Sequence, residues 1–313
     1  MKLQSDNTIK YLFLLFVIAI SIFSILIPDI FWSIANFQSI ASQIAVLGIL
    51  TLAMAIPMLT SGINLSIIAT MNACALIIAY FLTKQDSASY LLVGLLLSVL
   101  CAFIIGVLNG VLISLIRVSP ILATLGTMTL INGLNILMTD GSTIANFPAS
   151  FLSISSTTFF LIPLPLIIFL FLALIVWFFL EKTTIGKSIY FIGNNERATF
   201  YSGINTQKII MIVYVISAVL CIFAAVLMMS KLNSAKASYG DSYLLISILA
   251  SVLGGVNPDG GKGKLVGILI ALVLLQVIES GLNMLGVSSY ITMILWGALL
   301  ILFIFLQKYR LFK

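Results

Sequence analysis

The sequence predicts an all-α polytopic membrane protein with about ten transmembrane helices and no soluble domain. Hydrophobic residues make up 62% of the 313 residues, charged residues only 8%, and the mean hydropathy is +1.25. A soluble domain typically carries about 45–50% apolar and about 25% charged residues, so too few charges are present here to solvate a globule. The composition therefore excludes a soluble enzyme, a disordered chain and a nucleic-acid-binding protein.

Ten apolar runs are long enough, or nearly so, to cross a bilayer core of about 30 Å, which takes roughly 20 helical residues. In chain order they are residues 11–28, 40–60, 65–82, 90–116, 121–138, 159–180, 209–229, 244–256, 265–285 and 290–306. The run 244–256 is short, because its 13 residues rise only about 20 Å as a helix. It crosses fully only if its helix begins before Asp241 or the bilayer is locally thin.

The distribution of basic residues predicts the topology. The net charge of +6 comes from 15 Lys and Arg against 9 Asp and Glu, and cytoplasmic loops of membrane proteins carry an excess of Lys and Arg. Ten crossings and a cytoplasmic N-terminus leave three basic residues outside, Lys84, Lys231 and Lys236. The twelve inside are Lys2, Lys10, Arg117, Lys182, Lys187, Arg197, Lys208, Lys262, Lys264, Lys308, Arg310 and Lys313. Without a crossing by 244–256 the division becomes seven inside to eight outside, so the rule favours ten crossings with both termini cytoplasmic.

Two hydrophilic stretches interrupt what we expect to be a single transmembrane domain over residues 1–313. Residues 140–158 form an expected external loop, and residues 181–208 form the longest cytoplasmic loop. Lys2 and Lys10 precede the first span as in a signal peptide, but its 18-residue apolar core exceeds the usual length of about 7–15 residues. We therefore expect the first span to stay in place as a membrane anchor.

The residue types that enzymes and metal sites use are scarce. Histidine is absent, and Cys74, Cys101 and Cys221 lie inside apolar runs, which gives neither a disulfide framework nor a zinc-binding spacing. Every acidic residue except Glu279 lies in or beside a loop, so no carboxylate pair converges within the membrane. The sequence therefore predicts no catalytic site, cofactor or metal, and offers little basis for a proton-coupled carrier.

The glycine-rich stretch 254–264 is the nearest approach to a nucleotide-binding motif. A P-loop reads GxxxxGK followed by Ser or Thr, but Val256 stands at the first glycine position and Gly263 follows Lys262. We interpret the stretch as a tight cytoplasmic turn between two helices. Energy for uphill transport would then come from another chain.

Three segments in collinear order resemble the permeases of ribose-type ABC sugar importers, in the branched-chain/monosaccharide ABC permease family. Residues 193–204 read GNNERATFYSGI, similar to the family's G-x-N-E-x-A-A-x-x-S-G-I. Residues 120–128 read PILATLGTM and lead to NGL at 132–134 and TDG at 139–141. The third segment comprises LGG at 253–255, GGKG at 260–263 and GLN at 281–283.

The resemblance implies the permease subunit of an importer in the bacterial cytoplasmic (inner) membrane, forming the pathway for a monosaccharide or related small polyol or furanose. Its implied partners are ABC ATP-binding subunits, a second permease copy or homologous permease, a periplasmic or lipid-anchored sugar-binding protein, and membrane lipid. ATP hydrolysis would occur in the partners, and nucleic acid plays no part. The alternatives are a self-sufficient secondary transporter or channel for a small polar solute, and a membrane-embedded enzyme.

Departures from the family pattern leave the identity of the sugar open. Where the family reads G-I-D-L-S-V-G, residues 62–68 read GINLSII, so that Asn64 replaces the acid. Asn132 stands where the family has Arg, and Thr199 replaces the second Ala of the cytoplasmic segment.

Residues 195–203 carry the signals of a short helix bounded at both ends. Asn195 is a good N-cap, Glu196 lies in the first turn where the helix dipole favours an acid, and Gly203 suits the C′ position. A two-turn helix is unstable alone in water, and the resemblance implies that it docks on the ATP-binding subunit as a coupling helix. The alternative is a helix lying on the lipid surface. The residues expected at this interface are Asn195, Glu196, Arg197, Ala198, Phe200, Tyr201 and Gly203.

A second set of candidates concerns the translocation pathway. Amide side chains suit a sugar pathway, since they both donate to and accept from hydroxyl groups. The stretches NGLN at 132–135 and SGLN at 280–283 are near copies toward the external ends of their spans. Hydrogen bonding between helices is the alternative role for such residues. The pathway candidates are Asn64, Asn132, Asn135, Glu279 and Asn283.

Overall fold

The computed structural model describes residues 2–84 and 87–308, with side chains described for 12–84, 87–303 and 305. Arg310 and Lys313, which the charge distribution assigns to the cytoplasm, lie outside the described residues. Within the described ranges the chain is mostly helical, as the sequence predicts for a polytopic membrane protein.

Seven helices of the described chain are long and apolar enough to cross a membrane. They are α3 (Ile34–Met58), α4 (Ile67–Lys84), α5 (Ala88–Ser114), α6 (Pro120–Thr139), α8 (Leu164–Lys182), α11 (Thr206–Leu232) and α13 (Leu265–Met284). Three more helices have shorter apolar stretches, namely α1 (Lys2–Leu26), α12 (Asp241–Leu253) and α14 (Ser289–Lys308). Each of the ten predicted apolar runs therefore lies largely or wholly in a helix, and seven of them reach full spanning length.

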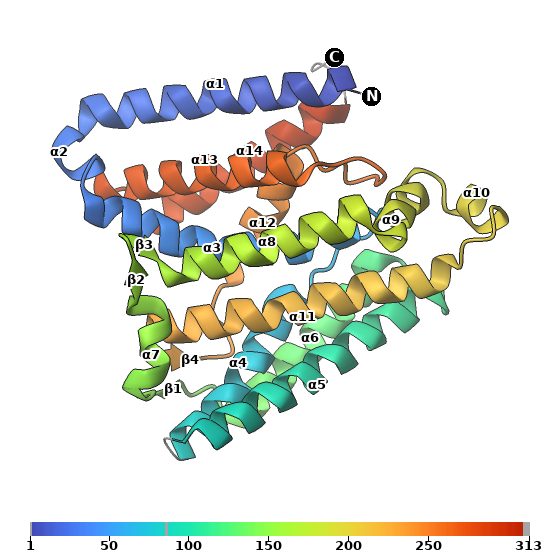
Figure 1. Cartoon of the computed structure of the whole chain (residues 1–313), viewed down its shortest axis with the longest axis horizontal. Helices are drawn as coiled ribbons and strands as arrows, with labels where there is room; N and C mark the ends of the chain where they lie inside the picture. Colours follow the sequence, from blue (N-terminus) through green and yellow to red (C-terminus); the bar gives the residue numbers. More distant parts are fainter. Residues whose placement is uncertain (1, 85–86, 309–313) are drawn as a thin grey trace.

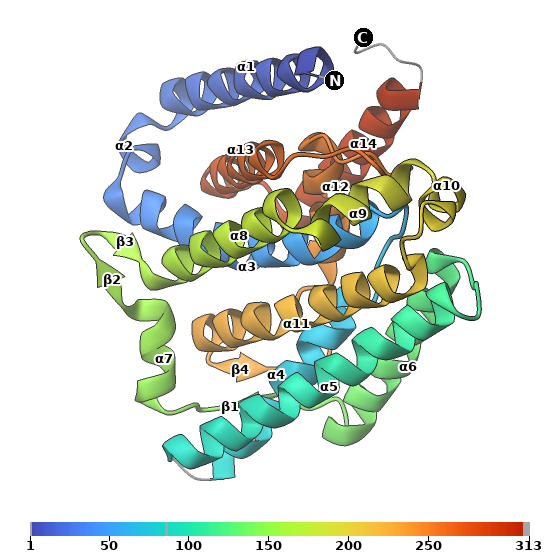
Figure 2. The ribbon, with the colours of Figure 1, turned by 45° about the vertical axis from the view of Figure 1, so that its right-hand side comes forward.

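The long helices lie side by side as a bundle, with α11 packed against α3, α4 and α5 (Figures 1 and 2). Gly106 permits the close approach of α5 and α11, because a Cβ atom there would lie 2.7 Å from the Cα of Val215. Helix α1 flanks the bundle and packs against α13, where the Phe23 ring occupies the space beside Gly281. Small residues at such contacts are typical of helix packing in membranes.

The bundle has two distinct ends (Figure 1). One end carries α9 (Thr184–Asn194), α10 (Glu196–Tyr201) and the turn 254–264, together with the start of α1 and the end of α14. The opposite end carries α2, α7 and two short antiparallel ladders, in which β1 pairs with β4 and β2 with β3. These elements are α2 (Pro28–Phe31), β1 (Ile144–Ala145), α7 (Ala149–Ser156), β2 (Thr158–Phe159), β3 (Ile162–Pro163) and β4 (Ser234–Ala235).

Both hydrophilic stretches contain more structure than the sequence indicates. The sequence predicts a loop over 140–158, but the stretch contains α7, where Phe151 is buried against the bundle. The stretch 181–208 contains α9 as well as α10, and Ile189 and Ile192 of α9 are buried. In both stretches, tertiary burial of a few apolar side chains stabilises short helices that polar composition alone does not predict.

The predicted span 244–256 is displaced and short. Helix α12 begins at Asp241 and not before it, and it ends at Leu253 after 13 residues. The chain from β4 to the turn 254–264 nevertheless passes from one end of the bundle to the other, partly through non-helical residues 236–240 (Figure 1). A similar non-helical segment, residues 59–66, precedes α4.

Candidate coupling surface and membrane-embedded polar residues

Helix α10 has the boundaries that its sequence predicts. The Asn195 side chain accepts a hydrogen bond from the backbone N–H of Ala198 at 3.0 Å, which caps the first turn. At the other end Gly203 has φ +84° and donates its N–H to the Phe200 carbonyl at 3.0 Å. A left-handed glycine at this position ends a helix at low steric cost, so both caps are local properties of the sequence.

The aromatic side chains of α10 point outward. Phe200 is 57% exposed and Tyr201 is 86% exposed, and their rings stack edge to face with centroids 5.8 Å apart. Arg197 and Ala198 are also exposed, whereas Thr199 is buried against the protein. Two adjacent exposed aromatic residues on a six-residue helix form an apolar patch of the kind that anchors a protein interface.

Glu196 links α10 to the connection between α5 and α6. Its carboxylate forms an ion pair with Arg117 and accepts a hydrogen bond from the Thr206 hydroxyl at 3.5 Å. Both side chains of the pair are solvent-exposed, so the pair contributes at most about 1 kcal/mol. Sequence reasoning missed Arg117 as a contact of α10, although it is the only charged residue between Leu115 and Ser119.

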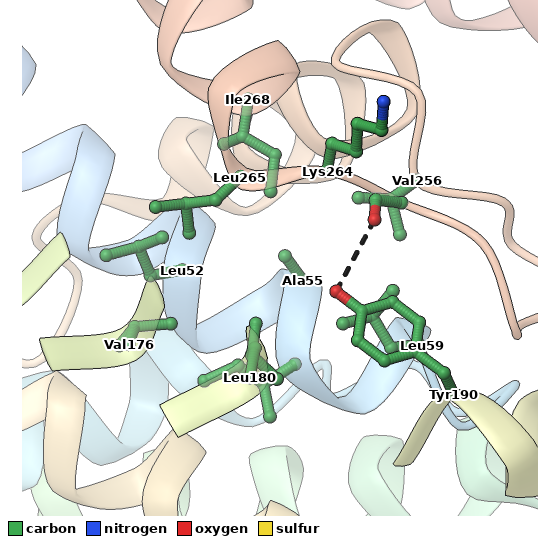
Figure 3. A pocket seen from close by; sticks show the side chains of 12 residues that line it. Leu52, Ala55, Leu59, Val176, Leu180, Tyr190, Val256, Lys264, Leu265 and Ile268 are labelled. Carbon is green, nitrogen blue, oxygen red and sulfur yellow. Dashed lines mark hydrogen bonds between the residues drawn. The ribbon is translucent and has the colours of Figure 1, made fainter. Parts of the chain in front are cut away.

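A small cavity lies beneath α9, between α3, α8 and the start of α13 (Figure 3). Its volume is about 10 Å³, about enough for one water molecule. Tyr190 of α9 lines it and donates its hydroxyl to the Gly263 carbonyl at 3.4 Å. Burial, together with the negative charge of Glu181, raises the pKa of Tyr190 to about 12. The Tyr190 hydroxyl is therefore protonated and able to donate at neutral pH. The cavity itself is too small to hold a sugar.

Two of the five predicted pathway residues are buried and hydrogen-bonded within the chain. Asn64 donates to the Ser217 hydroxyl at 2.9 Å and accepts from both the backbone N–H and the hydroxyl of Ser66. Asn135 donates to the Ala69 carbonyl of α4 at 3.1 Å. The Asn135 bond joins α6 to α4, and the bond from Asn64 to Ser217 joins the non-helical segment 59–66 to α11. Such bonds between segments correspond to the alternative role considered for the amides.

Sequence reasoning did not find Asn109, which belongs to the same polar network. It lies on α5, is 1% exposed and donates to the Ser66 hydroxyl at 2.9 Å. The Ser217 hydroxyl in turn donates to the Ala53 carbonyl at 2.6 Å. The signal for Asn109 was present, since it is the one amide in the apolar run 90–116.

The other three predicted pathway residues are less buried and have no described side-chain hydrogen bond. Asn132 and Glu279 are half-buried, and Asn283 is exposed. Glu279 interacts electrostatically with Lys231 at the end of α11 and with Tyr243 of α12. The five candidates therefore do not form one site, because α6 packs against α4 and α5 whereas α13 packs against α1, α3 and α12.

The two near copies, 132–135 and 280–283, also lie in different surroundings. A methyl group on Gly133 would have no neighbour within 4 Å, whereas Gly281 is covered by Phe23. Ser280 donates its hydroxyl to Asn36 at 2.7 Å, but Asn132 has no corresponding described bond. The sequence similarity of residues 132–135 and 280–283 therefore does not reflect a repeated local structure.

A bundle of long apolar helices with hydrogen-bonded polar residues in its interior is the architecture expected of a membrane permease. Residues 36–304 match the family described as "Branched-chain amino acid transport system / permease component". The chain belongs to this family, which confirms the resemblance to ribose-type ABC importer permeases.

Individual relatives match over most of their length. The chain is 33% identical to the ribose import permease protein RbsC of Bacillus subtilis (strain 168), covering 98% of this chain and 95% of the relative. It is 33% identical to RbsC of Haemophilus influenzae over 95% of this chain and 92% of the relative. The autoinducer 2 import system permease protein LsrD of Escherichia coli O9:H4 is 34% identical over 83% and 80% of the two chains. No solved structure matches the chain.

Proposed function

We propose that this chain is the non-catalytic membrane subunit of an ATP-binding-cassette importer for a monosaccharide or related small polyol or furanose. The observation that carries the proposal is the similarity to ribose import permeases over nearly the whole of both chains. The proposed location is the bacterial cytoplasmic membrane. The proposed partners are two ATP-binding subunits, a second permease and an external sugar-binding protein.

The geometry of α10 supports docking of an ATP-binding subunit. Phe200 and Tyr201 are exposed on a helix whose ends are fixed by Asn195 and Gly203, so the patch is preorganised. Glu196, Arg197 and Ala198 precede the aromatic pair in the same helix, and Arg197 can act as a charged rim residue. Motion of the docked subunits during ATP binding and hydrolysis would then reach the bundle through this helix.

We also propose ten crossings with both termini in the cytoplasm. The start of α1, the end of α14 and α10 lie at the same end of the bundle, in support of an even number of crossings (Figure 1). The chain between β4 and the turn 254–264 connects opposite ends, in support of a crossing that includes α12. Reporter fusions at Asn195 and Gly261 should both report the cytoplasm, and an external signal at Gly261 would contradict this topology.

For the pathway we favour Asn132, Glu279 and Asn283, whose side chains keep hydrogen-bonding capacity for a solute. Asn64 and Asn135 use theirs within the chain. Replacing Glu279 with Gln retains size and hydrogen bonding while removing the charge. We expect the Gln variant to lower uptake at unchanged membrane abundance, and unaltered uptake kinetics would argue against a role for the charge.

The import function is tested by reconstitution. The chain is co-expressed with its candidate ATP-binding subunits and partner permease, reconstituted in vesicles and supplied with sugar-loaded binding protein. Uptake of a labelled sugar should require ATP and should stop when the ATP-binding subunits carry an inactive nucleotide site. Uptake by this chain alone, driven by an ion gradient, would instead support the secondary-transporter alternative.

A further inference from the structure

Three segments that are distant in sequence meet through their backbones at the end of the bundle that carries α10. They are residues 59–61 between α3 and α4, residues 193–194 at the end of α9, and residues 259–261 in the turn between α12 and α13. We call this contact the glycine junction. The glycine junction is not part of the proposed docking surface. One of its three segments, residues 193–194, directly precedes that surface in the chain.

Hydrogen bonds connect all three segments of the junction. The Gly261 N–H donates to the Leu59 carbonyl at 2.9 Å. The Ser61 hydroxyl lies 2.6 Å from the Asp259 carbonyl and 3.4 Å from that of Gly193. The Asn194 side-chain amide reaches the Gly261 carbonyl at 3.4 Å. Each segment is therefore bonded to both of the others.

The absence of side chains makes this contact possible. A Cβ atom on Gly193 would lie 2.0 Å from the Leu59 carbonyl oxygen and 2.2 Å from the Gly261 nitrogen. A Cβ atom on Gly260 would lie 2.2 Å from the Ser61 hydroxyl oxygen. These distances are far below van der Waals contact, so any other residue would push the backbones apart.

The junction also stores backbone strain. Ser61 has φ +62°, a left-handed conformation that is unfavourable for a residue with a Cβ atom. Gly260 and Gly261 have φ +87° and +72°. A strained non-glycine residue persists only where its surroundings hold it, and such residues cluster at switch regions. The Ser61 hydroxyl has a single proton, and its hydrogen bond to the Asp259 carbonyl at 2.6 Å supplies that hold here.

Each segment of the junction adjoins either the proposed docking helix or a helix of the bundle. Asn194 adjoins Asn195, the N-cap of α10. Ser61 adjoins the buried segment 62–66, which contains Asn64 and precedes α4. Residues 259–261 join the short helix α12 to α13. A displacement of α10 therefore acts on the starts or ends of α4, α12 and α13 within a few residues.

We propose that the glycine junction transmits movement of α9 and α10 to α4 and α12, which both follow non-helical segments, and that Gly193, Ser61 and Gly260 are positioning residues of the transport cycle. The proposal rests on the proposed docking of ATP-binding subunits at α10. Residues along such a connection typically change coupling about two- to thirtyfold when altered. The strength of this coupling is measured as the number of sugar molecules taken up per ATP hydrolysed.

The test uses the complete reconstituted complex with S61A and G193A variants. S61A removes a hydroxyl without adding volume, and its matched control is S153A, whose hydroxyl donates only to the Ser150 carbonyl at the opposite end of the bundle. G193A adds a methyl group where there is no space, and its control is G133A, where a methyl group meets nothing within 4 Å.

We expect S61A and G193A to retain the ATP-binding subunits and to hydrolyse ATP, but to take up about two- to thirtyfold less sugar per ATP. The controls should keep the wild-type ratio. If G193A does not reach the membrane, the ratio of sugar to ATP measured for S61A alone tests the proposal. A wild-type ratio for S61A would overturn the proposal and make the junction a static contact. A wild-type complex that retains no ATP-binding subunits would instead overturn the proposed function.

Discussion

The bundle interior contains polar side chains in apolar surroundings, whereas helix α10 exposes apolar side chains on a hydrophilic segment. Asn64 and Asn135 are amides buried among apolar residues, whereas Phe200 and Tyr201 are aromatic residues exposed on a hydrophilic segment. The amides are satisfied within the chain by Ser217, Ser66 and Ala69. The two aromatic rings contact each other and otherwise face outward. Internal hydrogen bonding supports a structural role for the two amides, and the exposure of the two aromatic rings supports the proposed docking of a partner.

The largest effect on stability is expected for N64A in the interior. The substitution leaves the buried Ser66 and Ser217 groups without their Asn64 partner, at a cost of about 2 kcal/mol. The midpoint of thermal unfolding in detergent should fall clearly. The matched control is N283A, where the amide is exposed and has no described side-chain bond, so that the change should stay within about 0.5 kcal/mol. Equal midpoints for both variants would contradict a structural role for Asn64.

A smaller and more local effect is expected at the end of α10. G203A places a Cβ atom at φ +84°, which costs about 1 kcal/mol, and should loosen the last turn of the helix. Hydrogen exchange of the α10 amides should become faster while the rest of the bundle is unchanged. G133A is the control, because that glycine is helical with free space around it, and it should be neutral or stabilising. Unchanged exchange in G203A would show that α10 does not depend on its C-terminal cap.

The smallest effect is expected for the ion pair between Arg117 and Glu196. Both side chains are exposed, so the coupling energy in a double-mutant cycle of R117Q and E196Q should be about 0.5 kcal/mol or less. Salt should weaken it further, because exposed charges are screened. A coupling well above 1 kcal/mol at physiological salt would mean that α10 is held to the α5–α6 connection more firmly than its exposure indicates.

Features that depend on local chemistry could be predicted from the sequence. The apolar runs predicted the helices, and Asn195 and Gly203 predicted the ends of α10, because caps and hydrophobicity are properties of neighbouring residues. Features that depend on tertiary contact were missed. Helix α9 owes its order to burial of Ile189 and Ile192, and the glycine junction needs three segments that only the fold brings together.

The candidate pathway residues show the same limit. Asn64 lies between two apolar runs and Glu279 lies within one, and no local pattern distinguishes a polar group bonded inside the bundle from one that is available to a solute. The distinction depends on Ser217 and Ser66 beside Asn64, and on Lys231 and its surroundings near Glu279. The sequence identified the candidate residues, but only the packing distinguishes those that are hydrogen-bonded within the chain from those that are available to a solute.

The role of α10 as the docking element is tested most directly by the F200A/Y201A double variant. Each truncated anchor should cost roughly 2 kcal/mol or more of binding free energy if the pair is a hot spot, which is about thirtyfold in affinity per residue. The matched control is F159A/F160A, an adjacent exposed aromatic pair at the opposite end of the bundle.

Both double variants are purified from membranes together with the co-expressed ATP-binding subunits, at matched abundance of the permease. We expect F200A/Y201A to lose the ATP-binding subunits and substrate-stimulated ATP hydrolysis, while F159A/F160A retains both. Stoichiometric retention of the ATP-binding subunits by F200A/Y201A, with normal uptake, would contradict the assignment of α10 as the coupling element.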